Sequence, residues 1–312
     1  MTKPVIGFIG LGLMGGNMVE NLQKRGYELI VMDLNTEAVA KCLARGKARE
    51  AASARELAEA SDIVMLCLTK SDVVEKIVYA EDGILAGIRE GAVLIDFGTS
   101  IPASTRKIGA DLAKKGAGMI DAPLGRTPAH ATDGLLNIMA AGEKATFDKV
   151  KPVLEEQGEN VFYLGALGAG HTTKLINNFM GMTTVCTMSQ AFAVADRAGV
   201  DRQQLYHIMS TGPSNSPFMG FCKNYAVDGV SFHINEGETL GLVGESGCGK
   251  STTGLAVLRM TPLTEGRIVF DGEDISHPDA ATTKRLRRKM QMVYQDPFGA
   301  LNPRMRVLDI IG

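Results

Sequence analysis

The most informative part of this sequence lies near its start, at Val5-Ile6-Gly7-Phe8-Ile9-Gly10-Leu11-Gly12-Leu13-Met14-Gly15. Its first half is an apolar run that predicts a buried strand, and its second half carries the spacing GxGxxG before a helical pattern. A strand, a glycine turn and a helix in this order are the setting in which the motif binds a dinucleotide. Gly10 permits the tight turn, Gly12 lets the backbone approach a pyrophosphate, and Gly15 lets helix and strand pack closely. The predicted cofactor contacts in this loop are Gly10, Leu11, Gly12, Leu13, Met14 and Gly15.

A second strand is predicted over residues 28–32, and it ends at Asp33, near the spacing of about twenty residues at which such folds place an acid against the ribose. A carboxylate there accepts hydrogen bonds from the ribose hydroxyls and repels a 2′-phosphate. The next residues, Leu34 and Asn35, offer no arginine for that phosphate. The sequence therefore favours NAD(H) over NADP(H), with Asp33 as a cofactor ligand.

Short apolar strands then alternate with helical segments, which predicts an α/β Rossmann domain over residues 1–164. Thr69 and Thr99 each follow a predicted strand at its carboxyl end, where ligands bind in such sheets, and both are predicted cofactor contacts. A threonine in that place also serves as a simple helix cap. The remaining strands are predicted at Ile63–Leu66, Ala92–Ile95, Met119–Ala122, Gly134–Ala141 and Asn160–Tyr163.

A second glycine loop, Gly168-Ala169-Gly170, opens a predicted helix that carries Lys174 and Asn178 on one face. No residue from 175 to 195 is charged, and this run is long enough to cross a bilayer. Its asparagine, glutamine and threonine side chains favour instead a helix buried between two domains. Lys174 is either a solvated lysine or a proton donor to a developing oxyanion.

Arg126 lies in the predicted loop Pro123–Pro128, with no acid nearby in the sequence. Two interpretations remain open for this residue. It is either an ordinary surface arginine or a clamp for an anionic substrate, since a charge-assisted hydrogen bond contributes about 1.5–3 kcal/mol.

Four segments of the first 225 residues share a further pattern: GFIGLGLMG, IDFGTSIP, DAPLGRTPAHATDG and GAGHTTKLINN. The pattern resembles the β-hydroxyacid dehydrogenase family, which includes the 3-hydroxyisobutyrate and tartronate semialdehyde enzymes. The resemblance implies a Rossmann domain, then a long helix leading into an all-helical domain. It also implies reversible hydride transfer to a carbonyl carbon, with Lys174 as acid–base catalyst, Asn178 orienting the substrate and Thr99 near the nicotinamide.

One segment departs from the family pattern. Most members have Ser-Gly-Gly after DAPV, binding the substrate carboxylate, whereas this chain has Gly125, Arg126 and Thr127. That variant, with Lys-Leu-Ile-Asn-Asn, resembles the sulfolactaldehyde reductases, which implies that Arg126, Thr127 and Asn177 hold a sulfonate. A guanidinium suits such a fully ionised group. Gly98 stands where the family usually has serine, which removes a hydroxyl near the cofactor.

Composition excludes several classes of protein. The net charge is −2 and neither part of the chain is strongly basic, so nucleic-acid binding is not expected. The five cysteines contain no CxxC pair, so neither a disulfide framework nor a zinc site is indicated. We expect a cytoplasmic protein, because no signal-peptide layout precedes the first strand and no segment is read as spanning a membrane.

A second phosphate-binding motif follows at residues 244–251, Gly-Glu-Ser-Gly-Cys-Gly-Lys-Ser, between a predicted strand within residues 238–243 and a predicted helix at Thr252–Arg259. Further on, residues 290–305 resemble the Q-loop region of ABC transporter ATPases, most closely the dipeptide and oligopeptide import subunits. The basic run Lys284–Lys289 is interpreted as a solvated helix face. The predicted ATP-binding residues are Gly244, Gly247, Gly249, Lys250, Ser251, Thr252 and Gln295, and the predicted Mg²⁺ ligands are Ser251 and Gln295.

No apolar run ending in Asp-Glu, LSGGQ signature or switch histidine follows Gln295. We therefore expect at most weak binding of ATP and Mg²⁺, without coupled hydrolysis. The expected division is a Rossmann domain over 1–164, a shortened helical domain over 165–225, and an N-terminal fragment of an ABC-type ATPase over 226–312.

Three interpretations of the whole chain compete. It is an NAD(H)-dependent hydroxyacid dehydrogenase or aldehyde reductase with a foreign tail, an ATP-binding component of a peptide transporter with a foreign head, or a chimera of two gene fragments. The first is the preferred function and the third the preferred origin, because the segment 224–230 does not resemble an evolved linker. The expected partner is a small anionic hydroxyacid or aldehyde, and intact relatives are expected to form homo-oligomers through the helical domain.

Overall fold

The computed structural model describes residues 3–213 without a break, then 231–241, 250–261 and 266–292, together with positions 215, 216, 219, 220, 223 and 263. For residues 250–252 only the backbone is described. The chain divides into two compact units, Met1–Val230 and Ser231–Gly312.

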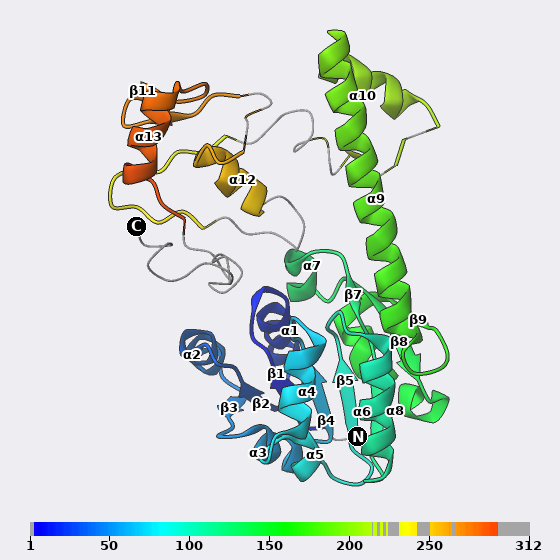
Figure 1. Ribbon diagram of the computed structural model, residues 1–312. Helices are drawn as coiled ribbons and strands as arrows, with labels where there is room; N and C mark the ends of the chain where they lie inside the picture. Colours follow the sequence, from blue (N-terminus) through cyan, green and yellow to red (C-terminus); the bar gives the residue numbers. More distant parts are fainter. Residues whose placement is uncertain are drawn as a thin grey trace, which may run out of the picture. The chain divides into compact units, whose positions relative to one another are not determined.

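The first unit alternates strands and helices along most of its length (Figure 1). Its strands are β1 (Ile6–Ile9), β2 (Leu29–Met32), β3 (Ala48–Glu50), β4 (Ile63–Leu66), β5 (Val93–Asp96), β6 (Gly118–Asp121), β7 (Leu124–Gly125), β8 (Leu136–Gly142) and β9 (Gly158–Tyr163). Its helices are α1 (Leu13–Lys24), α2 (Thr36–Ala44), α3 (Ala54–Glu59), α4 (Ser71–Tyr79), α5 (Ile84–Gly87), α6 (Pro102–Ala113), α7 (Pro128–Thr132), α8 (Lys144–Gln157), α9 (Ala169–Ala198) and α10 (Arg202–Thr211).

The strands form one sheet in the order β3-β2-β1-β4-β5-β6-β8-β7, with β9 paired to β8. The six strands from β3 to β6 are parallel, and β8 turns antiparallel to β6. The chain leaves β1 in one direction along the sheet towards β2 and later returns to its other side at β4. This reversal makes the carboxyl ends of β1 and β4 the place where such folds bind their ligands.

Helices cover both faces of the sheet because successive side chains of a strand point to opposite faces. On one face, Ile6 and Phe8 of β1 pack with the buried sides of α1, α2 and α8. On the other face, Ile9 of β1 packs with α3, α4, α5 and α6. The predicted Rossmann architecture is therefore confirmed.

The strands predicted from apolar runs in the first unit are all present, and none of their ends is shifted by more than two residues. Two strands were not predicted. β3 is a short edge strand with exposed charged residues, and β7 has two residues, so neither carries an apolar run.

α9 begins at the sheet edge and extends away from it, with α10 beside its far half (Figure 1). The predicted long helix is confirmed, but its expected burial is wrong. Ile176, Phe179 and Met180 are 63%, 73% and 67% exposed, and the buried residues of α9 are confined to its first turn and to the stripe Met188, Phe192 and Ala195. Met188 and Phe192 of that stripe meet Met219 and side chains of α10 in a small satellite core. No described helix is long and apolar enough to cross a membrane.

The second unit contains α12 (Lys250–Val257), a hairpin of β10 (Val269–Phe270) with β11 (Glu273–Asp274), and α13 (Ala280–Lys289). The helix predicted after the second phosphate motif corresponds to α12. Of the strand predicted before that motif, residues 238–241 are described and form no strand. The basic residues of α13 are exposed, as predicted for a solvated helix face, and two of them form exposed ion pairs with the hairpin, Arg285 with Glu273 and Lys289 with Asp271.

Candidate functional site

The glycine loop after β1 lies at the reversal point of the sheet. Gly10 has a φ of +100°, and a Cβ on it would lie 2.4 Å from the carbonyl oxygen of Cys67, which follows β4. Only glycine therefore fits, because both the left-handed backbone and the close approach exclude a side chain. The turn brings the start of α1 beside the carboxyl end of β4.

The first turn of α1 is open to an anion. Gly12 is the N-cap residue and supplies no side-chain acceptor for the first backbone N–H groups, and a Cβ on Gly12 would meet no atom within 4 Å. Gly15 differs, since its Cβ would lie 1.9 Å from the Gly10 carbonyl oxygen. A helix start without a side-chain cap and with space for a close approach fits the pyrophosphate of a dinucleotide. Of the other predicted contacts in this loop, Leu13 and Met14 begin α1, with Leu13 exposed and Met14 half-buried.

Asp33 follows β2 and lies beside the glycine loop that follows β1. Its carboxylate accepts hydrogen bonds from the backbone N–H groups of Leu11 and Asn35. These bonds fix the carboxylate beside the glycine turn, while Leu34 is 98% exposed. The geometry fits a ribose at Asp33 and offers no arginine at the following position for a 2′-phosphate.

Thr69 and Thr99 are both exposed, after β4 and β5 respectively. Between β5 and Thr99 lies Gly98, whose Cβ would be 2.8 Å from the Leu68 carbonyl oxygen and 2.9 Å from Asp96 Oδ1. The serine that is usual in the family would therefore crowd the backbone here. Glycine at this position therefore does two things: it relieves the crowding, and it removes the serine hydroxyl.

The start of α9 is held by the carboxylate of Asp121, the last residue of β6. Asp121 accepts from the backbone N–H groups of Gly168 and His171, each at 2.7 Å. Gly170 packs against β8 and β6, because its Cβ would lie 2.2 Å from the Met139 carbonyl oxygen. Burial raises the pKa of Asp121, and these two backbone donors oppose that rise.

Lys174, Asn177 and Asn178 lie on α9, one to two turns beyond this anchor. Lys174 and Asn178 are half-buried and Asn177 is exposed. Since Asp121 ends β6, the anchor places these residues beyond the carboxyl edge of the sheet. The glycine loop, Thr69 and Thr99 follow strands that end at the same edge.

Arg126 lies at the surface, and its guanidinium is paired. It has a φ of +76°, and its Nη1 lies 2.5 Å from Glu159 Oε2 and donates to the Leu135 carbonyl oxygen at 2.7 Å. Gly125 is the last residue of β7, opposite Asn137 of β8. Thr127 precedes α7, and its hydroxyl contacts His130 Nδ1 at 2.7 Å.

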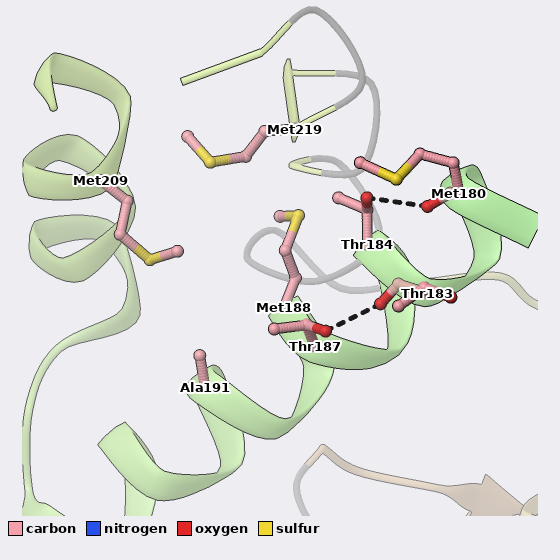
Figure 2. Close-up of a pocket in the computed structure, with 8 residues that line it drawn as sticks. All are labelled: Met180, Thr183, Thr184, Thr187, Met188, Ala191, Met209 and Met219. Carbon is pink, nitrogen blue, oxygen red and sulfur yellow. Dashed lines mark hydrogen bonds between the residues drawn. The ribbon is translucent and has the colours of Figure 1, made fainter. Parts of the chain in front are cut away.

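A cavity of about 320 Å³ lies elsewhere in the first unit, along the far half of α9 (Figure 2). Its lining is rich in methionine. The threonines add little polarity, because the hydroxyls of Thr184 and Thr187 donate to carbonyl oxygens of α9 itself. None of the predicted site residues lines it. The lining residues are Met180, Thr183, Thr184, Thr187, Met188, Ala191, Met209 and Met219.

Four residues of the predicted ATP site, Gly244, Gly247, Gly249 and Gln295, lie outside the described residues. Lys250, Ser251 and Thr252 begin α12, where the backbone alone is described. No group of His, Cys, Asp and Glu residues in the described ranges is arranged to hold a metal ion.

Two buried acids and a histidine at this edge were not predicted as site residues. Asp96 and Asp121 end neighbouring strands, and His171 lies in the first turn of α9; the three are almost fully buried. A signal was present, because an acid ends each of two consecutive apolar strands in the sequence.

Three family matches divide the chain. Residues 5–165 match the NAD binding domain of 6-phosphogluconate dehydrogenase, and residues 168–229 match the NAD-binding domain of NADP-dependent 3-hydroxyisobutyrate dehydrogenase. Residues 227–310 match the ABC transporter family.

Relatives and solved structures agree with the first two matches. An NAD-dependent L-serine dehydrogenase from Pseudomonas aeruginosa is 37% identical over 204 residues, covering 65% of this chain and 68% of the relative. A 3-sulfolactaldehyde reductase from Escherichia coli is 33% identical over 205 residues, covering 66% and 68%. A 3-hydroxyisobutyrate dehydrogenase from Mycobacterium tuberculosis, solved with L-serine, matches with a TM-score of 0.65 at 27% identity, covering 70% and 73%.

The sheet order and the glycine loop are those of the Rossmann class, and the family matches and relatives show an oxidoreductase with NAD(H) as cofactor. The chain belongs to the β-hydroxyacid dehydrogenase family, the 3-hydroxyisobutyrate dehydrogenase-like enzymes that act on CH–OH groups. Residues 227–310 carry instead the similarity to ABC transporters.

Proposed function

We propose that this chain catalyses reversible hydride transfer between NAD(H) and a small hydroxyacid or aldehyde that carries one anionic group, with Lys174 as the acid–base residue. The observation that carries the proposal is the anchoring of α9. Asp121 fixes the helix three residues before Lys174, at the sheet edge where the glycine loop and Thr99 also lie. Hydride transfer needs the cofactor, the substrate and the proton donor close together, and the same edge of the sheet provides this.

The roles of the residues follow from this placement. The open first turn of α1 would hold the pyrophosphate, Asp33 the ribose, and Thr69 and Thr99 the nicotinamide side. The bound nicotinamide supplies or accepts the hydride. Lys174 would protonate the carbonyl oxygen during reduction and remove the hydroxyl proton during oxidation. Asn178 shares a helix face with Lys174 and would orient the substrate.

The finer proposal concerns the anion. Arg126 stands where most of the family has glycine and is joined by Thr127, and a relative at 33% identity is named 3-sulfolactaldehyde reductase. We infer that Arg126, Thr127 and Asn177 hold a sulfonate-bearing aldehyde in preference to a carboxylate. Arg126 uses Nη1 for Glu159 and Leu135, and its other guanidinium donors point to a bidentate contact with the substrate anion.

Replacing Lys174 by alanine tests the proposed chemistry. We expect kcat to fall about 10²–10⁴-fold, because one positioned proton donor is lost. NADH affinity, followed by the change in its fluorescence, should stay near the unchanged protein's value. Lys151→Ala is the matched control, since Lys151 pairs with Glu155 on α8. Near-full turnover by Lys174→Ala would remove Lys174 from the mechanism.

A further inference from the structure

A buried histidine lies between the two acids that end β5 and β6. Asp96 and Asp121 are register partners on these parallel strands, so their side chains lie on the same face of the sheet. His171 is fully buried, with its Nε2 3.7 Å from Asp96 Oδ2 and its Nδ1 3.8 Å from Asp121 Oδ2. A polar ring so placed has lost all contact with water.

Each acid organises a different segment of the site. Asp96 accepts from the Gly98 N–H and from the Ser100 hydroxyl, both at 2.8 Å, and so shapes the loop that carries Thr99. Asp121 accepts from the first N–H groups of α9 and so fixes the helix that carries Lys174. The ring of His171 lies at the junction of the two segments.

The hydrogen bond of the ring indicates where its proton lies. Nδ1 contacts the Thr105 hydroxyl at 2.8 Å, while Nε2 has no hydrogen-bond partner in the described part of the chain. The Thr105 hydroxyl has one proton, which it can donate to Nδ1 or to the Ile101 carbonyl oxygen at 3.3 Å. When Nδ1 accepts it, the ring proton is on Nε2 and faces the Asp96 carboxylate. The other tautomer would direct a lone pair at a buried carboxylate, which is electrostatically unfavourable. The geometry therefore favours an Nε2–H directed at Asp96.

We propose that His171 is a positioning residue that ties the loop carrying Thr99 to the first turn of α9, and through that turn places Lys174 against the cofactor. The proposal rests on the dehydrogenase function proposed above. His171 does not touch the reacting atoms. It acts through Asp96 on one side and through Lys174, three residues further along α9, on the other.

Kinetics of two variants test this role. His171→Leu keeps a similar volume without polar atoms, and we expect kcat per NADH-binding site to fall about tenfold to a hundredfold, as for a reacting group displaced by up to 1 Å. His171→Gln retains a donor and an acceptor and should restore most of the loss. Gln157→Leu is the control, because Gln157 is another fully buried polar residue, bonded to the Met18 carbonyl oxygen and outside the site. It should lower the unfolding temperature while leaving kcat unchanged.

A second measurement does not depend on turnover. With ¹⁵N-labelled histidine, the His171 ring signals are assigned by their absence from His171→Gln, and we expect them to shift when NADH is added. Unshifted ring signals in a protein that binds NADH, or a kcat for His171→Leu equal to that of Gln157→Leu, would overturn the positioning role. If the unchanged protein binds NADH without turning over, the proposed reaction fails, and the ring signals still decide whether His171 senses the cofactor. A chain that binds no NADH overturns both proposals.

Discussion

At the scale of single residues, Arg126 combines a strained backbone with a defined partner. Its φ of +76° costs an L-residue roughly 1–2 kcal/mol relative to glycine. The guanidinium is held by Glu159 and the Leu135 carbonyl oxygen. Arg126 stands where the family usually has glycine, and these contacts therefore fix the orientation of its guanidinium. If Arg126 holds the substrate anion as proposed, Glu159 competes with the substrate for that cation.

Glu159→Gln should strengthen the binding of anionic substrates. Removing the competing charge leaves the Arg126 guanidinium available, so KM should fall several-fold, with the larger fall for a sulfonate than for a carboxylate. KM measured with both substrates at fixed NADH checks this expectation. Glu155→Gln, which unpairs Lys151 on α8, should change neither value. A raised KM in Glu159→Gln would mean that Glu159 orients Arg126 and does not compete for it.

At the scale of elements, the loop between β1 and α1 contains two kinds of glycine: two are required by packing, and one leaves space that we assign to the cofactor. Gly10 and Gly15 have no room for a Cβ, whereas Gly12 has open space and an extended backbone that alanine also adopts. The three glycines of one motif should therefore respond differently to the same substitution.

Gly12→Ala should retain the unfolding temperature of the unchanged protein and lose most of its NADH affinity, since the methyl group fills the space for the pyrophosphate. Gly15→Ala should be destabilised by about 2 kcal/mol or more, because α1 must move away from the Gly10 carbonyl. Thermal unfolding and NADH titration of both variants check the pair. An equal loss of stability in the two would show that Gly12 is also structural.

Much of this unit could be predicted from its sequence, for physical reasons. Buried parallel strands appear as continuous apolar runs, and the glycine motif fixes the position of the first turn. Contacts between residues far apart in sequence could not be predicted. Glu159 reaches Arg126 only because β9 pairs with β8, and the junction at His171 depends on the Asp96–Asp121 register. The burial of α9 was misjudged because an uncharged run does not reveal whether anything packs against it.

At the scale of the whole molecule, the chain joins two units with different relatives, at Val230 in the structure and near residue 228 in the family matches. The first unit has a continuous core on both faces of its sheet. The described part of the second unit buries few large side chains, Ile275 and Leu286 among them. We therefore expect the units to unfold separately.

Calorimetry of the full chain with NADH tests this expectation. A ligand that binds only the folded state stabilises it by about 2.7 kcal/mol at a concentration of 100 times its Kd. NADH should therefore raise the temperature of one unfolding transition and leave the other unchanged. A single transition that moves as a whole would show that the two units unfold cooperatively.

The exposed face of α9 has a consequence for the life of the protein in a cell. Ile176, Phe179 and Met180 present to water the kind of surface that quality-control chaperones and proteases bind. The hydroxyls of α9 add little polarity to the helix surface, because those of Thr184, Thr187 and Ser189 donate to carbonyl oxygens of the same helix. The amount of protein present would then depend on how quickly that face is covered after synthesis, and abundance would limit activity before the chemistry proposed for Lys174 does.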